Sequence, residues 1–287
     1  FIDRLFIYEP DAIQRLRLES FDILISLDKD DEATTLATAV EAKRKIGFGL
    51  DRKTGNLIPL NKESLYAFKL GVCDELKFRK NQKTYPEIIF EMASLKYQND
   101  EYILNLNNSD KVYAKELLSR IGIKNNGLII GLNTGAGDRF ANKAWTQDGF
   151  VELIRIIRAN TQAKVLLLGG PQEKLRNVNM LSKSGNLAYD AGCNHSLSQF
   201  AAIVDFCSLV VSGDTTALHI AIALKKKVVA IFGSTCAQEI ELYGRGRKIF
   251  SDIKCRPCYK KECDKQINCM NSIKPAEVFQ AISELLL

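Results

Sequence analysis

The chain has 287 residues, 46% of them hydrophobic, and a formal net charge of +6 at pH 7. This length suits about two domains. No apolar run approaches the roughly 18 residues that a membrane helix needs, and the charge is far below that typical of a nucleic-acid-binding protein. The positive balance would suit an anionic partner, such as a nucleotide, a phosphosugar or an acidic membrane surface, or it could serve only solubility. The first residue is Phe1 and nothing resembles a signal peptide, so a cytoplasmic protein is expected.

The N-terminal third alternates short strands and helices. Residues 21–27 predict a buried strand, because the run is apolar and rich in β-branched side chains. An acidic run at 28–32 follows, and then a helix and a short strand at 45–49. Residues 65 to about 104 are expected to be mostly helical.

The pattern sharpens after residue 126. Four apolar strands are predicted at 127–132, 164–168, 209–211 and 227–232, with helices at 146–159 and 198–206. Strands alternating with helices predict an α/β fold whose parallel sheet is covered on both faces. The polar stretch 121–126 precedes the first of these strands, so the expected domains are 1–122 and 123–287.

Ligands bind such sheets at the carboxyl ends of the strands. The first C-terminal strand ends in Asn-Thr-Gly-Ala-Gly-Asp at 133–138, where Thr134, Gly135 and Gly137 could bring backbone N–H groups close to a phosphate. A plain turn is the alternative, since the stretch matches neither standard phosphate-binding fingerprint. Lys143 follows, either as a cation over a bound phosphate or as a solvated loop residue.

The next two strands also end in polar groups. Glu173 comes after Gly169-Gly170-Pro171, where it could accept hydrogen bonds from ribose hydroxyls or merely complement a helix dipole. Further on, Asp214 is expected to be a helix N-cap, with Thr215 and Thr216 in the first turn and His219 on the same face as Thr215. A helix N-terminus suits a pyrophosphate, although an ordinary cap and a core histidine would produce the same pattern.

Taken singly these signals are weak, but they converge. The fourth strand ends in a further polar turn, Gly233-Ser234-Thr235. Strand ends that all carry such groups predict one nucleotide-sized crevice. A Rossmann-type oxidoreductase is disfavoured, because no strand is followed by G-x-G-x-x-G with an acidic residue about 20 positions on.

The eight cysteines fall into two groups. Cys73, Cys193, Cys207 and Cys236 are scattered and are expected to be small buried hydrophobes. Cys255, Cys258, Cys263 and Cys269 lie within fifteen residues, but only one pair has the spacing of a zinc knuckle. A zinc or iron site, disulfides and reduced thiols all remain open for this cluster.

Several stretches together resemble glycosyltransferase family 9, the ADP-heptose:lipopolysaccharide heptosyltransferases. They are "FIDRLFIYEP", "FDILISLDKD", "AKRKIGFGL", "GLNTGAGDRFANKAWTQDGFVELI", "VLLLGGPQE", "LVVSGDTTALHIAIAL", "VVAIFGST" and "CRPCYKKECDKQINCM". The resemblance covers almost the whole chain. It implies a GT-B architecture of two Rossmann-like domains with parallel sheets, the C-terminal one holding the donor. It further implies that the N-terminal domain lacks its first strand-helix portion in this chain.

The resemblance also implies roles for the candidate residues. The loop from Thr134 to Gly137 and Lys143 would meet the diphosphate, and Glu173 the nucleoside. The diphosphate and donor sugar would meet Asp214, Thr215, Thr216 and His219. The activity implied is inverting transfer of a heptose-type sugar from ADP-heptose to a lipopolysaccharide core or another glycolipid, with no cofactor required. Such an enzyme would be bacterial and cytoplasmic, with peripheral contact to the inner membrane.

The chain departs from the family pattern in two places. Thr216 stands where the family usually has glycine, which leaves the donor sugar open. The family's general base is expected in residues before Phe1. A non-catalytic nucleotide-sugar- or carbohydrate-binding protein on the same fold is therefore the alternative. The Asp28-Lys29-Asp30 run has the form of the metal-binding D-x-D of other glycosyltransferases, but is expected to be a solvated loop.

Overall fold

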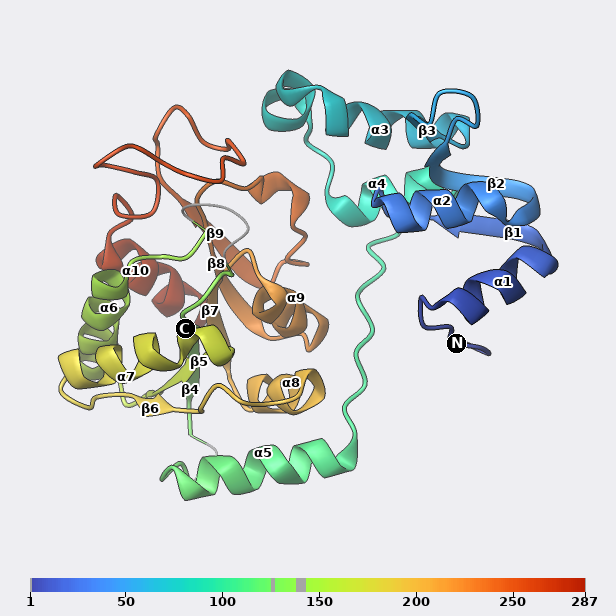
Figure 1. Ribbon diagram of the computed structural model, residues 1–287. Coiled ribbons are helices and arrows are strands. Elements are labelled where there is room, and N and C mark those ends of the chain that lie inside the picture. The colour runs from blue at the N-terminus through green and yellow to red at the C-terminus, as the bar shows by residue number, and fades with distance from the viewer. Residues whose placement is uncertain (1, 125–126, 138–142, 287) are drawn as a thin grey trace. The chain divides into compact units, whose positions relative to one another are not determined.

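Two separate sheets organise the chain, each within its own compact unit (Figure 1). The structure is a computed structural model and describes residues 2–124, 127–137 and 143–286. Unit 1 comprises Phe1–Asp100 and Gln238–Glu241, and unit 2 comprises Glu101–Ala237 and Leu242–Leu287. The division lies before the boundary expected at residue 122, because helix α5 (Asn108–Arg120) packs against α8 (Leu197–Asp205) of unit 2.

Unit 1 contains a small mixed sheet. Its strands are β1 (Ser20–Ser26), β2 (Glu41–Leu50) and β3 (Leu57–Pro59). Strands β1 and β2 are parallel, as the fold class predicts, whereas β3 runs antiparallel to β2. The expectation of a buried strand at 21–27 was wrong, because Ile23 and Ile25 of β1 are exposed. Strand β2 is longer than the expected 45–49 and directly follows α2 (Asp31–Ala39). Helix α1 (Pro10–Leu18) precedes β1 and has no buried residue.

The helical part of unit 1 is shorter than the sequence predicts. It consists of α3 (Leu65–Val72), a π-helical turn at Leu76–Lys80 and α4 (Tyr85–Met92). Residues 93–107 contain no helix or strand, so the expectation of helix up to about residue 104 was wrong there. Ser94 and Asn99 have positive φ angles of 59° and 60°, a conformation that an α-helix cannot include.

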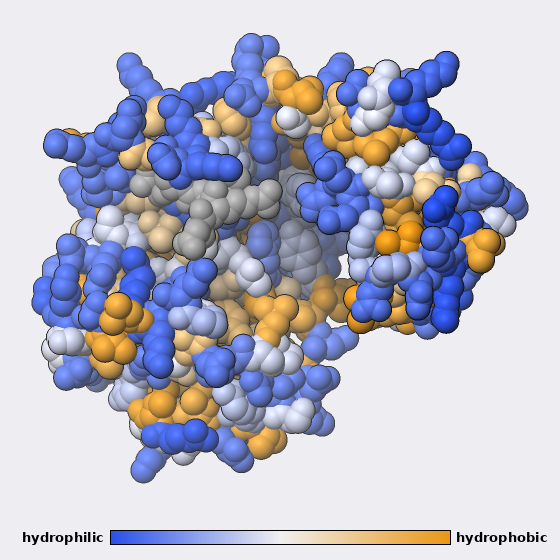
Figure 2. Space-filling view, viewed as in Figure 1, coloured by the Kyte–Doolittle hydropathy of each residue, from blue (hydrophilic) through white to orange (hydrophobic). Residues whose placement is uncertain are grey.

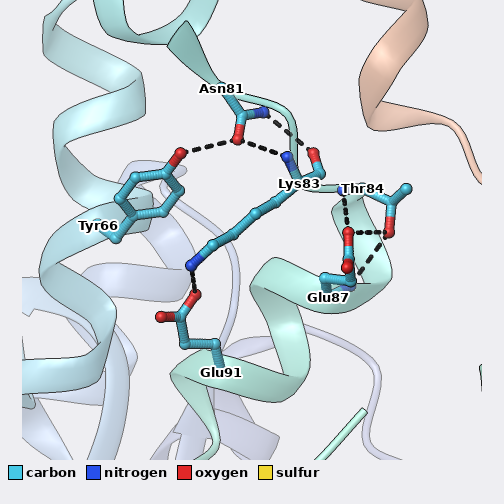
Figure 3. Close-up of polar contacts among 6 residues, drawn as sticks. All are labelled: Tyr66, Asn81, Lys83, Thr84, Glu87 and Glu91. Atoms are coloured by element: carbon cyan, nitrogen blue, oxygen red, sulfur yellow. Dashed lines mark hydrogen bonds and ion pairs between the residues drawn. The ribbon is translucent and has the colours of Figure 1, made fainter. Parts of the chain in front are cut away.

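Side-chain hydrogen bonds fix the start of α4 and its approach to α3 (Figure 3). Thr84 and Glu87 form a capping box, in which the backbone N–H of Thr84 donates to Glu87 Oε2 at 2.6 Å. Just before it, Asn81 Oδ1 accepts from the hydroxyl of Tyr66 at 2.8 Å and from the backbone N–H of Lys83 at 3.1 Å.

Unit 2 is built on a six-stranded sheet in which every pair of neighbours is parallel. Its strands are β4 (Ile129–Asn133), β5 (Lys164–Leu168), β6 (Tyr189–Asp190), β7 (Leu209–Gly213), β8 (Lys227–Phe232) and β9 (Gly246–Phe250). Their order is β6-β5-β4-β7-β8-β9. The first strand, β4, is therefore central: β5 and β6 are added on one side of it, and β7, β8 and β9 on the other. This is the Rossmann order, and it confirms the predicted doubly wound parallel sheet. The short strands β6 and β9 were not predicted.

Helices cover both faces of this sheet (Figure 1). The helices α6 (Gln147–Asn160), α7 (Lys174–Lys183) and α10 (Pro275–Leu286) lie on one face, with α8 and α9 (Thr216–Ala223) on the other. Helix α6 shows why: Phe150, Leu153, Ile154 and Ile157 recur at helical spacing and are all buried in the core. Thr146 caps this helix by accepting from the N–H of Gly149 at 3.1 Å.

The surface agrees with the composition. Most of the face visible in Figure 2 is hydrophilic, with hydrophobic atoms in several separate patches. Among the described residues, no helix combines the length and the apolar character that a membrane span requires. The excess of basic over acidic residues lies in unit 2.

Candidate donor-binding site

Unit 2 has a crevice of about 590 Å³ at the carboxyl ends of its strands. It opens where the strand order reverses between β4 and β7, which is where α/β sheets bind ligands. Its wall is formed by the strand-end loops and the first turns of α8 and α9: Asn133, Gly135, Ala136, Gly137, Lys143, Gly169, Gly170, Pro171, Gln172, Glu173, Cys193, His195, Leu197, Phe200, Thr215, Thr216 and Ala217. We call this the unit 2 crevice.

The N-terminus of α9 forms one end of the unit 2 crevice. The helix begins at Thr216, and its N-cap is Thr215, whose backbone is extended (φ −146°, ψ 172°). The expectation that Asp214 is the N-cap was therefore wrong by one residue. The Thr215 hydroxyl accepts from Asn133 Nδ2 at 3.2 Å, and the same amide donates to Ser212 Oγ at 3.2 Å. Asn133 thus links the ends of β4 and β7 beside the first N–H groups of α9, which are donors that suit an anion.

Asp214 lies behind this end, between two basic side chains. One carboxylate oxygen is 3.7 Å from Lys143 Nζ and the other is 3.8 Å from His219 Nε2. Burial alone would raise the pKa of Asp214, but the polar interaction with His219, the charge of Lys143 and the hydroxyl of Thr235 outweigh it, so this pKa lies below its ordinary value. The carboxylate therefore stays ionised and orients Lys143 and His219.

The loop after β4 supplies backbone to the middle of the unit 2 crevice. Thr134 is fully buried, and its hydroxyl donates to Asn177 Oδ1 at 2.6 Å. Gly135 and Gly137 line the unit 2 crevice, and Gly137 has a φ of +63°, which favours glycine. A Cβ on Gly135 would come within 2.1 Å of the Glu173 carboxyl group. Glycine is therefore required for Glu173 to lie against this loop.

Glu173 closes the side of the unit 2 crevice that follows β5. It ends the 3₁₀ turn Pro171–Glu173, and its Oε2 accepts from the backbone N–H of Gly170 at 2.8 Å. The other carboxylate oxygen keeps acceptor capacity toward the unit 2 crevice, as a ribose diol would require.

An apolar end, which the sequence analysis missed, completes the unit 2 crevice. It consists of Cys193, His195, Leu197 and Phe200, from the segment between β6 and the first turns of α8. No sequence motif predicts these positions. They follow the two-residue strand β6 through an irregular loop, which has no regular pattern of polar and apolar residues. Asn133 had a detectable signal, since it is a polar residue at the last position of a buried strand.

The structure brings most of the expected site residues together. Gly135, Gly137, Lys143, Glu173, Thr215 and Thr216 all line the unit 2 crevice. Thr134 and Asp214 support it from behind, and His219 is linked to it through Asp214. Lys143 and the N-terminus of α9 at one end, with an apolar surface at the other, suit a nucleoside diphosphate.

The cysteines follow the expectation only in part. Cys193, Cys207 and Cys236 are buried, but Cys73 is exposed, so its assignment to the core was wrong. In the cluster, Cys255 and Cys263 are exposed, Cys258 is half-buried and Cys269 is buried, all as free thiols. Within residues 2–124, 127–137 and 143–286, no three His, Cys, Asp or Glu side chains are grouped closely enough to hold a metal ion.

The first three residues of the acidic run, Asp28–Asp30, form a loop between β1 and α2. Asp28 Oδ1 accepts from the backbone N–H groups of Lys29 and Asp30, at 2.7 and 3.2 Å, and both aspartates are exposed. The carboxylate of Asp28 is thus used to stabilise its own loop, as a solvated turn would do.

Gly213→Ala tests how tightly the strand ends are packed. The added Cβ would lie 2.7 Å from the backbone carbonyl oxygen of Lys143, so one of the two segments must shift. We expect a loss of about 1–3 kcal/mol in the free energy of unfolding, measured by urea titration. Gly127→Ala is the matched control, because its Cβ would meet no atom within 4 Å. Equal effects of the two substitutions would contradict the packing described here.

The thiol of Cys193 is expected to react slowly although it lines the unit 2 crevice. Burial raises the pKa of Cys193 to about 11 from a reference of 9.0, so its thiolate fraction at pH 8 falls roughly 100-fold. Alkylation followed by peptide mass spectrometry should show Cys193 reacting far more slowly than the exposed Cys73, and its rate should rise with pH up to about 11. Comparable rates for the two thiols at pH 8 would contradict the assignment.

Comparison with known proteins relates this architecture to heptosyltransferases. A lipooligosaccharide heptosyltransferase 2 from Campylobacter jejuni is 28% identical over 170 residues, which are 57% of this chain and 53% of that protein. The chain thus spans about half the length of the curated relatives it matches. Two solved structures share the fold. A family 9 glycosyl transferase from Veillonella parvula aligns with a TM-score of 0.70 and 16% identity, over 96% of this chain and 77% of that one. The E. coli ADP-heptose lps heptosyltransferase II aligns with a TM-score of 0.61 and 16% identity, over 96% of this chain and 80% of that one.

These likenesses confirm the GT-B fold class expected from the sequence. The model of glycosyltransferase family 9 (heptosyltransferase) matches residues 11–268, which is most of the chain. The chain therefore belongs to glycosyltransferase family 9.

Proposed function

We propose that this protein transfers a heptose-type sugar from ADP-heptose to a lipopolysaccharide core acceptor, with inversion at the transferred carbon. Membership of family 9, the relative from Campylobacter jejuni and the fold shared with an ADP-heptose lps heptosyltransferase support this activity. The observation that carries the proposal is that Thr215, Thr216 and Lys143 face one open crevice at the start of α9.

The chemistry proposed for the unit 2 crevice is stabilisation of the leaving group. As the bond from the sugar to ADP breaks, negative charge grows on the diphosphate. The free N–H groups at the start of α9, the Thr216 hydroxyl and the Lys143 ammonium would stabilise this charge electrostatically. Glu173 would accept from the ribose, and Cys193, Leu197 and Phe200 would pack against the base.

We propose that these groups do this without a metal cofactor, because a helix N-terminus and a lysine supply the positive charge. An inverting displacement also needs a base on the acceptor hydroxyl, which we assign to none of the described residues. Because the proposed acceptor is a glycolipid, we also propose that the protein is cytoplasmic and contacts the cytoplasmic face of the inner membrane peripherally. Turnover that survives EDTA would support metal independence, whereas turnover restored only by a divalent cation would contradict it.

The experiment that tests the proposal has two stages. First, ADP is titrated into the protein while the fluorescence of Trp145 is followed, since this single tryptophan lies two residues from Lys143. Second, ADP-heptose and heptose-deficient lipopolysaccharide are supplied, and the acceptor is analysed by mass spectrometry. Saturable ADP binding and a mass gain of one heptose are expected. Absence of ADP binding would overturn the proposal.

Thr216 in place of the family's usual glycine favours a second candidate, a nucleotide-sugar-binding protein without transferase activity. Thr216 is exposed at the first position of α9 and lines the unit 2 crevice, where its side chain would add bulk beside a bound donor. ADP binding with no transfer would support this candidate. Thr216→Gly distinguishes the two readily, because transfer gained by this variant would identify the side chain as the obstacle.

A further inference from the structure

The chain has two histidines, and each contacts a tyrosine of residues 101–120. We call this stretch the connector segment; it comprises the first residues of unit 2 and ends with α5. His195 lies in the apolar end of the unit 2 crevice, whereas His219 lies on α9 beside Asp214. A stretch with no motif of its own thus reaches both ends of the site.

Tyr113, on α5, fixes His195. The Nε2 atom of His195 is 3.0 Å from the carbonyl oxygen of Ala191, and Nδ1 is 2.9 Å from the hydroxyl of Tyr113. A carbonyl oxygen can only accept, so Nε2 carries the proton. In the neutral imidazole Nδ1 is then the acceptor, and the Tyr113 hydroxyl donates to it. One tautomer and one ring orientation are thereby selected.

This arrangement determines what His195 presents to the unit 2 crevice. Both ring nitrogens are already hydrogen-bonded, so the ring contributes a carbon surface and no further donor or acceptor. The rings of Tyr113 and His195 also meet edge to face, with centroids 5.9 Å apart. Without the Tyr113 hydroxyl, the Nδ1 atom would lose its partner and the ring could turn.

Tyr102 contacts His219 from the start of the connector segment. The two rings are 6.4 Å apart at 61°, and Tyr102 also meets Tyr243 edge to face at 6.1 Å. The preceding residue anchors this contact, because Glu101 accepts two hydrogen bonds from Arg245, at 3.0 and 2.8 Å. Such a bidentate pair fixes both the position and the direction of the backbone beside it.

We propose that Tyr102 and Tyr113 are positioning residues of the donor site, and that the connector segment sets the orientation of His195 in the unit 2 crevice and of His219 behind it. This inference rests on the proposed function of the unit 2 crevice, because the effect is expected on ADP. The tyrosines act through His219 and His195, so the nucleotide does not need to touch them.

The test compares each tyrosine with a matched tyrosine in unit 1. Tyr113→Phe removes the hydroxyl that donates to His195, while Tyr66→Phe removes a hydrogen bond of similar length to Asn81 (Figure 3). Tyr102→Leu removes the ring beside His219, while Tyr97→Leu removes a ring that packs edge to face on Phe90. Tyr102→Phe retains the ring and separates its contribution from that of the hydroxyl.

Two readouts are used for every variant, the ADP dissociation constant and long-range ¹H–¹⁵N spectra of the imidazoles. Two histidines give two assignable ring systems. In the wild type, His195 should be protonated at Nε2 only. Tyr113→Phe should move the His195 Nδ1 signal, because this nitrogen loses its donor while the Ala191 carbonyl keeps the proton on Nε2. Tyr102→Leu should move the His219 signals, and each substitution should weaken ADP binding about 3–10-fold, the value of one hydrogen bond or ring contact.

The outcomes separate this inference from the proposed function. If the wild-type protein does not bind ADP, the proposed function fails. If it binds ADP but Tyr113→Phe and Tyr102→Leu bind it within twofold of wild type, the inference is overturned. It is also overturned if the two unit 1 controls weaken ADP equally, or if His195 is protonated at Nδ1. Weaker ADP binding confined to the connector variants, with the matching spectral changes, supports it.

Discussion

Lys143→Met is expected to lower the affinity for ADP about 100-fold. Lys143 lines the unit 2 crevice with its side chain only 17% exposed, 3.7 Å from Asp214. Methionine keeps most of the side-chain volume but removes a charge-assisted contact to the diphosphate, worth about 1.5–3 kcal/mol. The substitution also removes the cation that compensates the Asp214 carboxylate, so this carboxylate would repel the negatively charged diphosphate. Isothermal titration calorimetry with ADP measures the change.

A double variant makes this prediction sharper. In the Lys143→Met background, Asp214→Asn removes the uncompensated charge and should recover about tenfold of the lost affinity. Lys226→Met is the control, because Lys226 forms an ion pair with Asp205 at 2.8 Å and is 20% exposed, but does not line the unit 2 crevice. A double variant no better than Lys143→Met would show that the pair does not act as a unit.

Trp145→Ala should destabilise unit 2 by about 3–5 kcal/mol. The indole is 2% exposed, its ring meets that of Phe150 edge to face at 4.9 Å, and Nε1 donates to the carbonyl oxygen of Ile273 at 3.4 Å. Truncation creates a cavity and leaves a buried carbonyl group without this donor. At about 2–4 °C per kcal/mol for a domain of this size, the melting temperature should fall by at least about 6 °C.

Circular dichroism measures this effect without the lost fluorophore. Leu175→Ala is the control, since Leu175 is 72% exposed on α7 and its truncation should change the free energy of unfolding by less than about 0.5 kcal/mol. Trp145→Phe should lie between the two. A Trp145→Ala variant as stable as Leu175→Ala would contradict the place of the indole in the core.

The candidate site was only partly predictable from the sequence. Polar groups directly after buried strands could be identified, because parallel strands deliver their carboxyl ends to one edge; this located Lys143, Glu173 and Thr216. Thr215, and not Asp214, is the cap, and its hydroxyl accepts a hydrogen bond from Asn133, which lies on another strand and 82 residues away in the sequence. No local pattern encodes such a bond.

The sequence by itself determined the parallel sheet of unit 2, since short apolar runs such as 164–168 and 227–232 have a strand conformation wherever both faces are covered. It also determined the helices whose buried faces recur at 3.6-residue spacing, α6 above all. Only the tertiary structure decided that α5 belongs to unit 2, that residues 93–107 are not helical, and that Cys193 and His195 line the crevice. Those outcomes depend on contacts between residues far apart in the chain, such as Tyr113 with His195, whose energies exceed weak local preferences.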